Sequence, residues 1–81
     1  MAESAKTIDI SILGRNYKIA CEEGEREALL EAVSYLDGKM GEIKNAGKVN
    51  GTDRIAVMAA LNIAHEFLEL ATQVLLLKRA Q

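Results

Sequence analysis

The chain has 81 residues, which suits one small domain and leaves no room for a catalytic domain beside a regulatory one. Ten Lys and Arg against twelve Asp and Glu give a net charge of −2, whereas a nucleic-acid-binding domain usually carries a basic surplus. The apolar share of 49% is almost entirely aliphatic. A core from so short a chain contributes ~3–5 kcal/mol, and its single cysteine excludes an internal disulfide. We therefore expect oligomerisation to supply the missing stability.

The first 21 residues predict a β-hairpin. Apolar and polar residues alternate with a period of two over residues 7–13 and again over 17–21, which is typical of half-buried strands. The turn between them is either a tight turn with Gly14 in its first central position or a three-residue loop over Gly14, Arg15 and Asn16, and in both cases we expect Arg15 at the tip. Two strands alone are unstable in water, so the hairpin needs a helix or another chain against its apolar face.

The next segment changes to a helical period. From about Glu22, apolar residues recur at spacings of four and three up to Ile43, with acidic residues in the first turns and Gly47 as a plausible C-terminal cap. A loop over residues 48–51 follows. Thr52 is the expected N-cap of a second helix that runs from Asp53 almost to the end.

The second helix is too long and too apolar for its own chain to cover. Its first half is apolar nearly all round, and Leu61, Leu68 and Leu75 form an additional heptad repeat in its second half. The main apolar stripe, which we call the helix seam, is the predicted oligomer interface. It consists of Ile63, Phe67, Leu70, Val74 and Leu77.

These segments together predict an α+β fold: an N-terminal β-hairpin, one shorter helix, and one long C-terminal helix that forms a coiled coil or bundle in an oligomer. Residues 1–52 form the predicted small head, and residues 53–81 form the predicted oligomerisation helix. The N-terminal residues 1–7 lack the apolar run of a signal peptide. The sequence has no run of 18 apolar residues, so we expect no membrane span. A lone cysteine without a signal peptide is typical of a cytoplasmic protein.

Catalytic motifs fail on spacing. His65 is the only histidine, and Glu69 stands where a zinc protease would need its second histidine. Asn62 stands where a di-iron bundle would carry the glutamate of its Glu-x-x-His pair. Residues 47–52 have the residue types of a phosphate loop in the wrong order, and Cys21 has acidic neighbours that disfavour a thiolate. We therefore expect no enzymatic activity, no metal and no cofactor.

The remaining functional candidates are charged residues. Acidic residues are concentrated between Glu22 and Glu31, and a set of basic residues lies elsewhere in the chain. Either both sets are simply solvated surface, or the basic residues form a surface that docks a partner protein. This basic set is Arg15, Lys18, Lys44, Lys48 and Arg54. Positions in turns and loops favour partner binding. A small dimeric DNA-binding or regulatory helical module is the alternative, which the net negative charge disfavours.

Three segments carry a resemblance to a known family. They read IDISILGR at 8–15, YLDGKM at 35–40 and RIAVMAALNIA at 54–64. As a combination they resemble the ZapA family of bacterial cell-division proteins over residues 8–68. The resemblance implies a non-enzymatic protein that binds FtsZ at the division site and crosslinks and bundles its protofilaments.

The resemblance also implies an assembly and a binding site. Heads of two chains pair, and long helices join two such dimers in antiparallel fashion. The charged residues expected to contact FtsZ are Arg15, Lys44, Lys48 and Asp53. Glu22 and Glu23 stand where relatives often carry proline after the cysteine. In the family the coil continues well past the position of Gln81, so the oligomerisation helix is expected to be truncated here.

Overall fold

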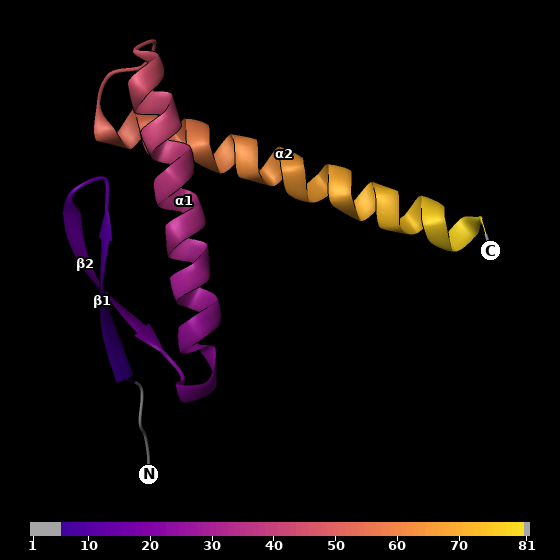
Figure 1. Ribbon diagram of the computed structural model, residues 1–81, viewed down its shortest axis with the longest axis horizontal. Helices are drawn as coiled ribbons and strands as arrows, with labels where there is room; N and C mark the ends of the chain where they lie inside the picture. The colour runs from indigo at the N-terminus through magenta and orange to yellow at the C-terminus, as the bar shows by residue number, and fades with distance from the viewer. Residues whose placement is uncertain (1–5, 81) are drawn as a thin grey trace.

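A computed structural model describes residues 6–80 of the chain, so residues 1–5 and Gln81, which the predicted boundaries include, lie outside it. Its elements are strands β1 (Lys6–Ile12) and β2 (Arg15–Cys21), a short 3-10 helix (Glu23–Glu25), and helices α1 (Arg26–Ala46) and α2 (Thr52–Arg79). Figure 1 shows the hairpin beside α1, while α2 leaves the head and extends alone to the C-terminus. The predicted α+β fold is confirmed.

The hairpin forms as the alternation predicts, but its turn differs. β1 and β2 are antiparallel, and Ile12 pairs with Arg15, which leaves Leu13 and Gly14 as a two-residue turn. Leu13 has φ 53° and Gly14 has φ 81°, the combination of positive values that a two-residue hairpin turn favours. Both predicted turns, which placed Arg15 at the tip, are therefore wrong. Arg15 is the first residue of β2, and the tip consists of Leu13 and Gly14.

Helix α1 covers the hairpin on the side of β1. It begins after the 3-10 turn, later than the sequence predicted, because the chain first closes a turn in which the Glu22 amide donates to Glu25 Oε1 at 3.4 Å. It ends as predicted at Gly47, whose left-handed φ of 73° lets its amide donate to the Lys44 carbonyl at 3.1 Å.

Helix α2 has 28 residues and begins at Thr52. Its N-cap is Gly51 rather than the predicted Thr52. Gly51 has φ 96°, and its carbonyl accepts the first helical hydrogen bond from Ile55 at 3.0 Å. A side chain would be strained at this φ, which explains why the chain places glycine here and gives up a side-chain cap.

The core lies where the two helices cross. Met40 of α1 packs with Ile55 and Ala59 of α2, and these three residues are at most 4% exposed. Ile12 and Leu36 are partly buried against them, so the hairpin also contacts this core. Beyond the crossing, α2 projects from the head. The molecule therefore measures 45 × 43 × 14 Å, with two arms lying in one plane (Figure 1).

Candidate functional site

Two of the four predicted partner-binding residues face one groove, although 38 positions separate them in the sequence. Arg15 begins β2 and Asp53 lies in the first turn of α2, and both line a groove of about 430 Å³ between the hairpin and the helices. We call this the head groove. Its apolar lining includes Ile10 and Met40, which are 5% and 3% exposed. The head groove therefore combines an apolar floor with charged residues at its edge.

Lys48 lines a second groove, which shares Asp53 with the head groove. It occupies about 490 Å³ between the loop and α2, and its lining includes Lys48, Asp53 and Arg54. We call it the loop groove. Since Asp53 lines both grooves, the structure brings Arg15, Lys48 and Asp53 together. Lys44 lines neither groove and lies exposed in the last turn of α1.

The charges of these residues are not neutralised within the described chain. Among residues 6–80, the ion pairs involve neither Arg15, Lys44, Lys48 nor Asp53. Lys18, which also lines the head groove, instead lies 3.6 Å from Asp9. Arg54 belongs to the basic set, yet sequence reasoning did not place it in the binding site. In the structure Arg54 lines the loop groove beside Asp53. The sequence signal that could have identified it is its position one residue after Asp53.

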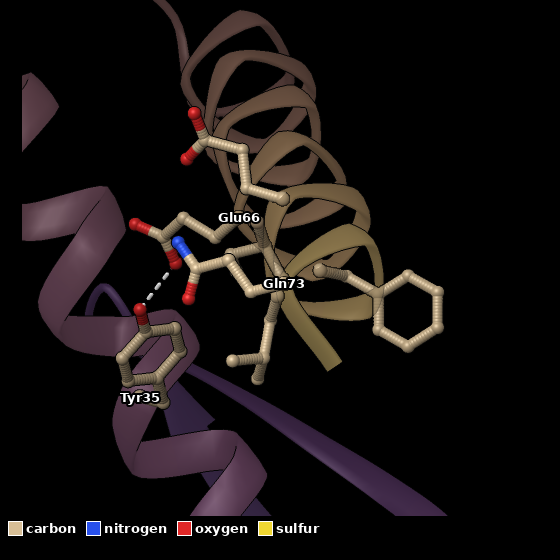
Figure 2. A pocket seen from close by; sticks show the side chains of 7 residues that line it. Tyr35, Glu66 and Gln73 are labelled. Atoms are coloured by element: carbon tan, nitrogen blue, oxygen red, sulfur yellow. Dashed lines mark hydrogen bonds between the residues drawn. The ribbon is translucent and has the colours of Figure 1, made fainter. Parts of the chain in front are cut away.

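A separate cluster lies in the angle between the helices. The Tyr35 hydroxyl of α1 donates a hydrogen bond to Glu66 Oε1 (Figure 2), and Lys39 Nζ forms an ion pair with Glu66 Oε2. Lys39 Nζ also lies 5.5 Å from the centre of the Tyr35 ring. We call these three residues the elbow cluster. Sequence reasoning missed it, because Glu66 lies 27 and 31 residues along the chain from its partners Lys39 and Tyr35.

The elbow cluster shifts the pKa of each member. The hydrogen bond from Lys39, followed by that from Tyr35, lowers the pKa of the Glu66 carboxyl. The same bonds to Glu66 raise the pKa values of Lys39 and Tyr35. Each shift favours the protonation state that makes the bonds: an ionised Glu66, a charged Lys39 and a neutral Tyr35.

The helix seam lies next to the elbow cluster and is largely uncovered. Ile63, Phe67 and Leu70 line a pocket of about 400 Å³ beside Tyr35 and Glu66 (Figure 2). Phe67 and Leu77 are each 67% exposed, and Leu70 and Val74 are 61% and 45% exposed. A single chain therefore does not bury the predicted oligomer interface. Its role in assembly stays a prediction.

Residues 6–80 contain no group of three or more His, Cys, Asp or Glu side chains that could hold a metal ion. His65 lies 3.3 Å from Glu69 on the surface of α2, and Cys21 is buried at the end of β2.

Helix α2 is long and apolar enough to cross a membrane, although only 11% of its most apolar window is buried. Helix α2 meets this criterion by its length and composition only. The ion pair between Glu66 and Lys39 of α1 lies near the middle of α2. A spanning α2 would carry these charged groups into the bilayer, where they are expensive. The geometry therefore favours protein as the cover of α2.

Comparisons with known proteins agree on one family. The family described as "Cell division protein ZapA" matches residues 8–80. A curated relative of that name from Pseudomonas aeruginosa is 53% identical over 64 residues, which are 79% of this chain and 62% of the relative. The chain thus spans less than two thirds of the length of that relative.

Two solved structures share the fold. A conserved bacterial protein of unknown function from Pseudomonas aeruginosa PAO1 is 48% identical, with a TM-score of 0.80 over 86% of this chain and 77% of that one. A ZapA mutant dimer from Geobacillus stearothermophilus is 24% identical, with a TM-score of 0.70 over 96% of this chain and 90% of that one. The family match extends over nearly the whole chain, and the chain therefore belongs to the ZapA family of cell division proteins.

Proposed function

We propose that this protein is a non-enzymatic crosslinker that binds FtsZ in the cytoplasm at the division site and bundles its protofilaments. Residues 1–52 act as the binding head, and residues 53–81 act as the oligomerisation helix. Membership of the ZapA family supports the proposal. The observation that carries it is the grouping of Arg15, Lys48 and Asp53 around two adjoining grooves of the head, apart from the exposed helix seam.

The separation of the two surfaces suits a crosslinker. If the helix seam joins two dimers whose heads pair, each copy adds one head with its own charged groups, and the long arm of α2 keeps the two head pairs apart. A filament then meets several weak contacts on one rigid body, and the effective concentration of the second contact replaces high single-site affinity. The related ZapA mutant from Geobacillus stearothermophilus is a dimer, which supports self-association of this kind.

The test reverses one charge at each end of the head. Arg15→Glu places a carboxylate in the head groove, whereas Arg26→Glu makes the same change at the first residue of α1, at the far end of that helix. We expect Arg15→Glu to reduce co-sedimentation with FtsZ polymers by about tenfold, as loss of one or two charged contacts would. Arg26→Glu should bind like the parent protein. Equal binding by both variants would remove Arg15 from the site.

A further test separates binding from assembly. Both variants should keep the parent mass in light scattering, because neither residue belongs to the helix seam. The DNA-binding alternative gains no support from the structure, since the head presents Asp53 beside its cations. The absence of a shifted band with duplex DNA at low salt would close that alternative.

A further inference from the structure

Helices α1 and α2 are held together at two separate places. The first is the apolar crossing, where Met40 packs with Ile55 and Ala59. The second is the elbow cluster, where Glu66 of α2 binds Tyr35 and Lys39 of α1. Glu66 follows Ala59 by seven residues, or about two helical turns. The two contacts therefore lie at different distances from the vertex of the angle between the helices.

The apolar crossing alone does not set that angle. Apolar packing is non-directional, and only Met40, Ile55 and Ala59 are buried at the crossing, while the apolar residues around them, which include Leu36 and Ile43 of α1, are only partly buried. We expect such a contact to keep the helices close and still to allow α2 to pivot. A second contact further along α2 removes this freedom, because two points fix a direction.

The chemistry of the elbow cluster makes the second contact directional. The two carboxylate oxygens of Glu66 accept from different donors, the Tyr35 hydroxyl and Lys39 Nζ. Tyr35 and Lys39 are four residues apart and therefore share one face of α1. The Lys39 ammonium lies 5.5 Å from the Tyr35 ring centre, and its side chain is only 21% exposed. Each member thus orients the other two, and Figure 2 shows the Tyr35 hydroxyl directed at the Glu66 carboxylate.

We propose that Tyr35, Lys39 and Glu66 are positioning residues that fix the direction in which α2 leaves the head. The length of α2 amplifies any error in this direction. About 20 residues separate Ala59 from the end of α2, which is roughly 30 Å of helix, so a 10° change at the crossing moves the tip by about 5 Å. The elbow cluster thereby sets the distance between heads in an assembled crosslinker, a consequence that rests on the proposed function.

The direct test measures the angle in solution. Spin labels at Glu27→Cys on α1 and Lys78→Cys on α2, in a Cys21→Ser background, report the distance between the two arms by double electron–electron resonance. Labelled chains diluted in an excess of unlabelled chains keep the signal within one chain. We expect a narrow distance distribution for the parent and a clearly broader one for Glu66→Ala. A parent-like distribution for Glu66→Ala would overturn the proposal.

Matched variants separate positioning from folding. Glu69→Ala removes the same side chain one turn later, where Glu69 pairs with His65 on α2 itself, and should leave the distribution narrow. Tyr35→Phe keeps the ring and removes only the hydroxyl donor, so it should broaden the distribution with helix content unchanged by circular dichroism. Broadening by Glu69→Ala to the same extent as Glu66→Ala would contradict a specific role for the elbow cluster.

A second measurement connects the angle to the filaments. Electron tomography of FtsZ bundles should show one regular filament spacing with the parent and a wider spread with Glu66→Ala, while co-sedimentation stays the same. If the parent does not bind FtsZ at all, the proposed function fails. The distance measurement does not involve FtsZ and still decides the role of the elbow cluster.

Discussion

The backbone amide of Leu13, in the hairpin turn, donates a hydrogen bond of 2.7 Å to Oδ1 of Asp37 on α1. The two residues are 24 positions apart in the chain. This bond attaches the turn to the helix, and Arg15 begins β2 two residues later. The turn also holds Leu13 at a positive φ that leucine rarely adopts, so the chain depends on this contact and on the partial burial of Leu13 against the core.

We expect Asp37→Ala to lower the free energy of unfolding by about 1 kcal/mol, because the Leu13 amide loses an anionic acceptor at a partly exposed site. The variant should also weaken FtsZ binding modestly by loosening the turn before Arg15. Asp37→Asn retains an acceptor oxygen and should lie between the parent and Asp37→Ala. Urea denaturation at fixed protomer concentration measures the effect. Identical midpoints for all three proteins would contradict it.

The strands and helices were predictable because local patterns specify them. Alternating isoleucines in residues 7–13 indicate β1, and spacings of three and four indicate α1 and α2. The turn was not, because Leu13 at positive φ contradicts its local preference and depends on Asp37. The N-cap of α2 was missed for a different reason: Thr52 is the better cap by residue type, whereas the positive φ of Gly51 decides where the helix starts.

For the candidate site, too, the residues were predictable but their contacts with distant segments were not. The charged residues of the head were identified through a family resemblance, which gives their positions but not their grouping. That Arg15 and Asp53 share the head groove depends on how α2 crosses the hairpin. The elbow cluster has no local signal at all, because Glu66 and Lys39 look like ordinary surface charges until the helices are placed. Contacts between distant segments are the part that periodicity does not encode.

The pKa shifts of the elbow cluster predict how its contribution depends on pH. Glu66 has a pKa below its ordinary 4.5, so its contribution is complete above that value and is lost as the pH falls through the lowered pKa. Lys39 and Tyr35 have pKa values above their ordinary 10.5 and 10.0. Their contributions are complete below those values and are lost as the pH rises through the raised pKa values.

We therefore expect the stability difference between the parent and Glu66→Gln to be constant between about pH 5.5 and 9 and to shrink on both sides. Thermal unfolding of both proteins across a pH series, at one protomer concentration, measures it. The difference should shrink at acidic pH because protonated Glu66 then resembles glutamine. A difference that grows towards acidic pH would have the wrong sign for a carboxylate that is stabilised in its ionised form.

The small core predicts a large effect for one methionine and a small one for another. Met40 is 3% exposed and packs with Ile55 and Ala59, whereas Met58 of α2 is 40% exposed. We expect Met40→Ala to cost about 2–4 kcal/mol of unfolding free energy, the range for truncating a buried large side chain. Met58→Ala serves as the matched control and should cost well under half of that within one chain. Equal losses in urea denaturation would show that assembly buries Met58 as fully as Met40.

The exposed helix seam gives the sharpest test of assembly. Phe67 is 67% exposed in the single chain, so Phe67→Asp removes little packing within that chain and should leave helix content by circular dichroism near the parent level. If the seam joins copies of the protein, the same change places a carboxylate in an apolar interface, which costs several kcal/mol unless the charge is paired. We expect the oligomer to dissociate, and light scattering across a concentration series measures the mass.

A control on the same helix makes this outcome specific. Thr72→Asp introduces the same carboxylate at an exposed residue of α2 that does not line the pocket formed by the seam residues, and it should preserve the parent mass. Phe67→Asp should also abolish FtsZ bundling while leaving binding by single heads, because avidity is lost before the charged contacts are. An unchanged mass for Phe67→Asp would exclude the helix seam as the oligomer interface. The exposed apolar side chains of α2 would then have to be buried by something other than a second copy packed on the helix seam.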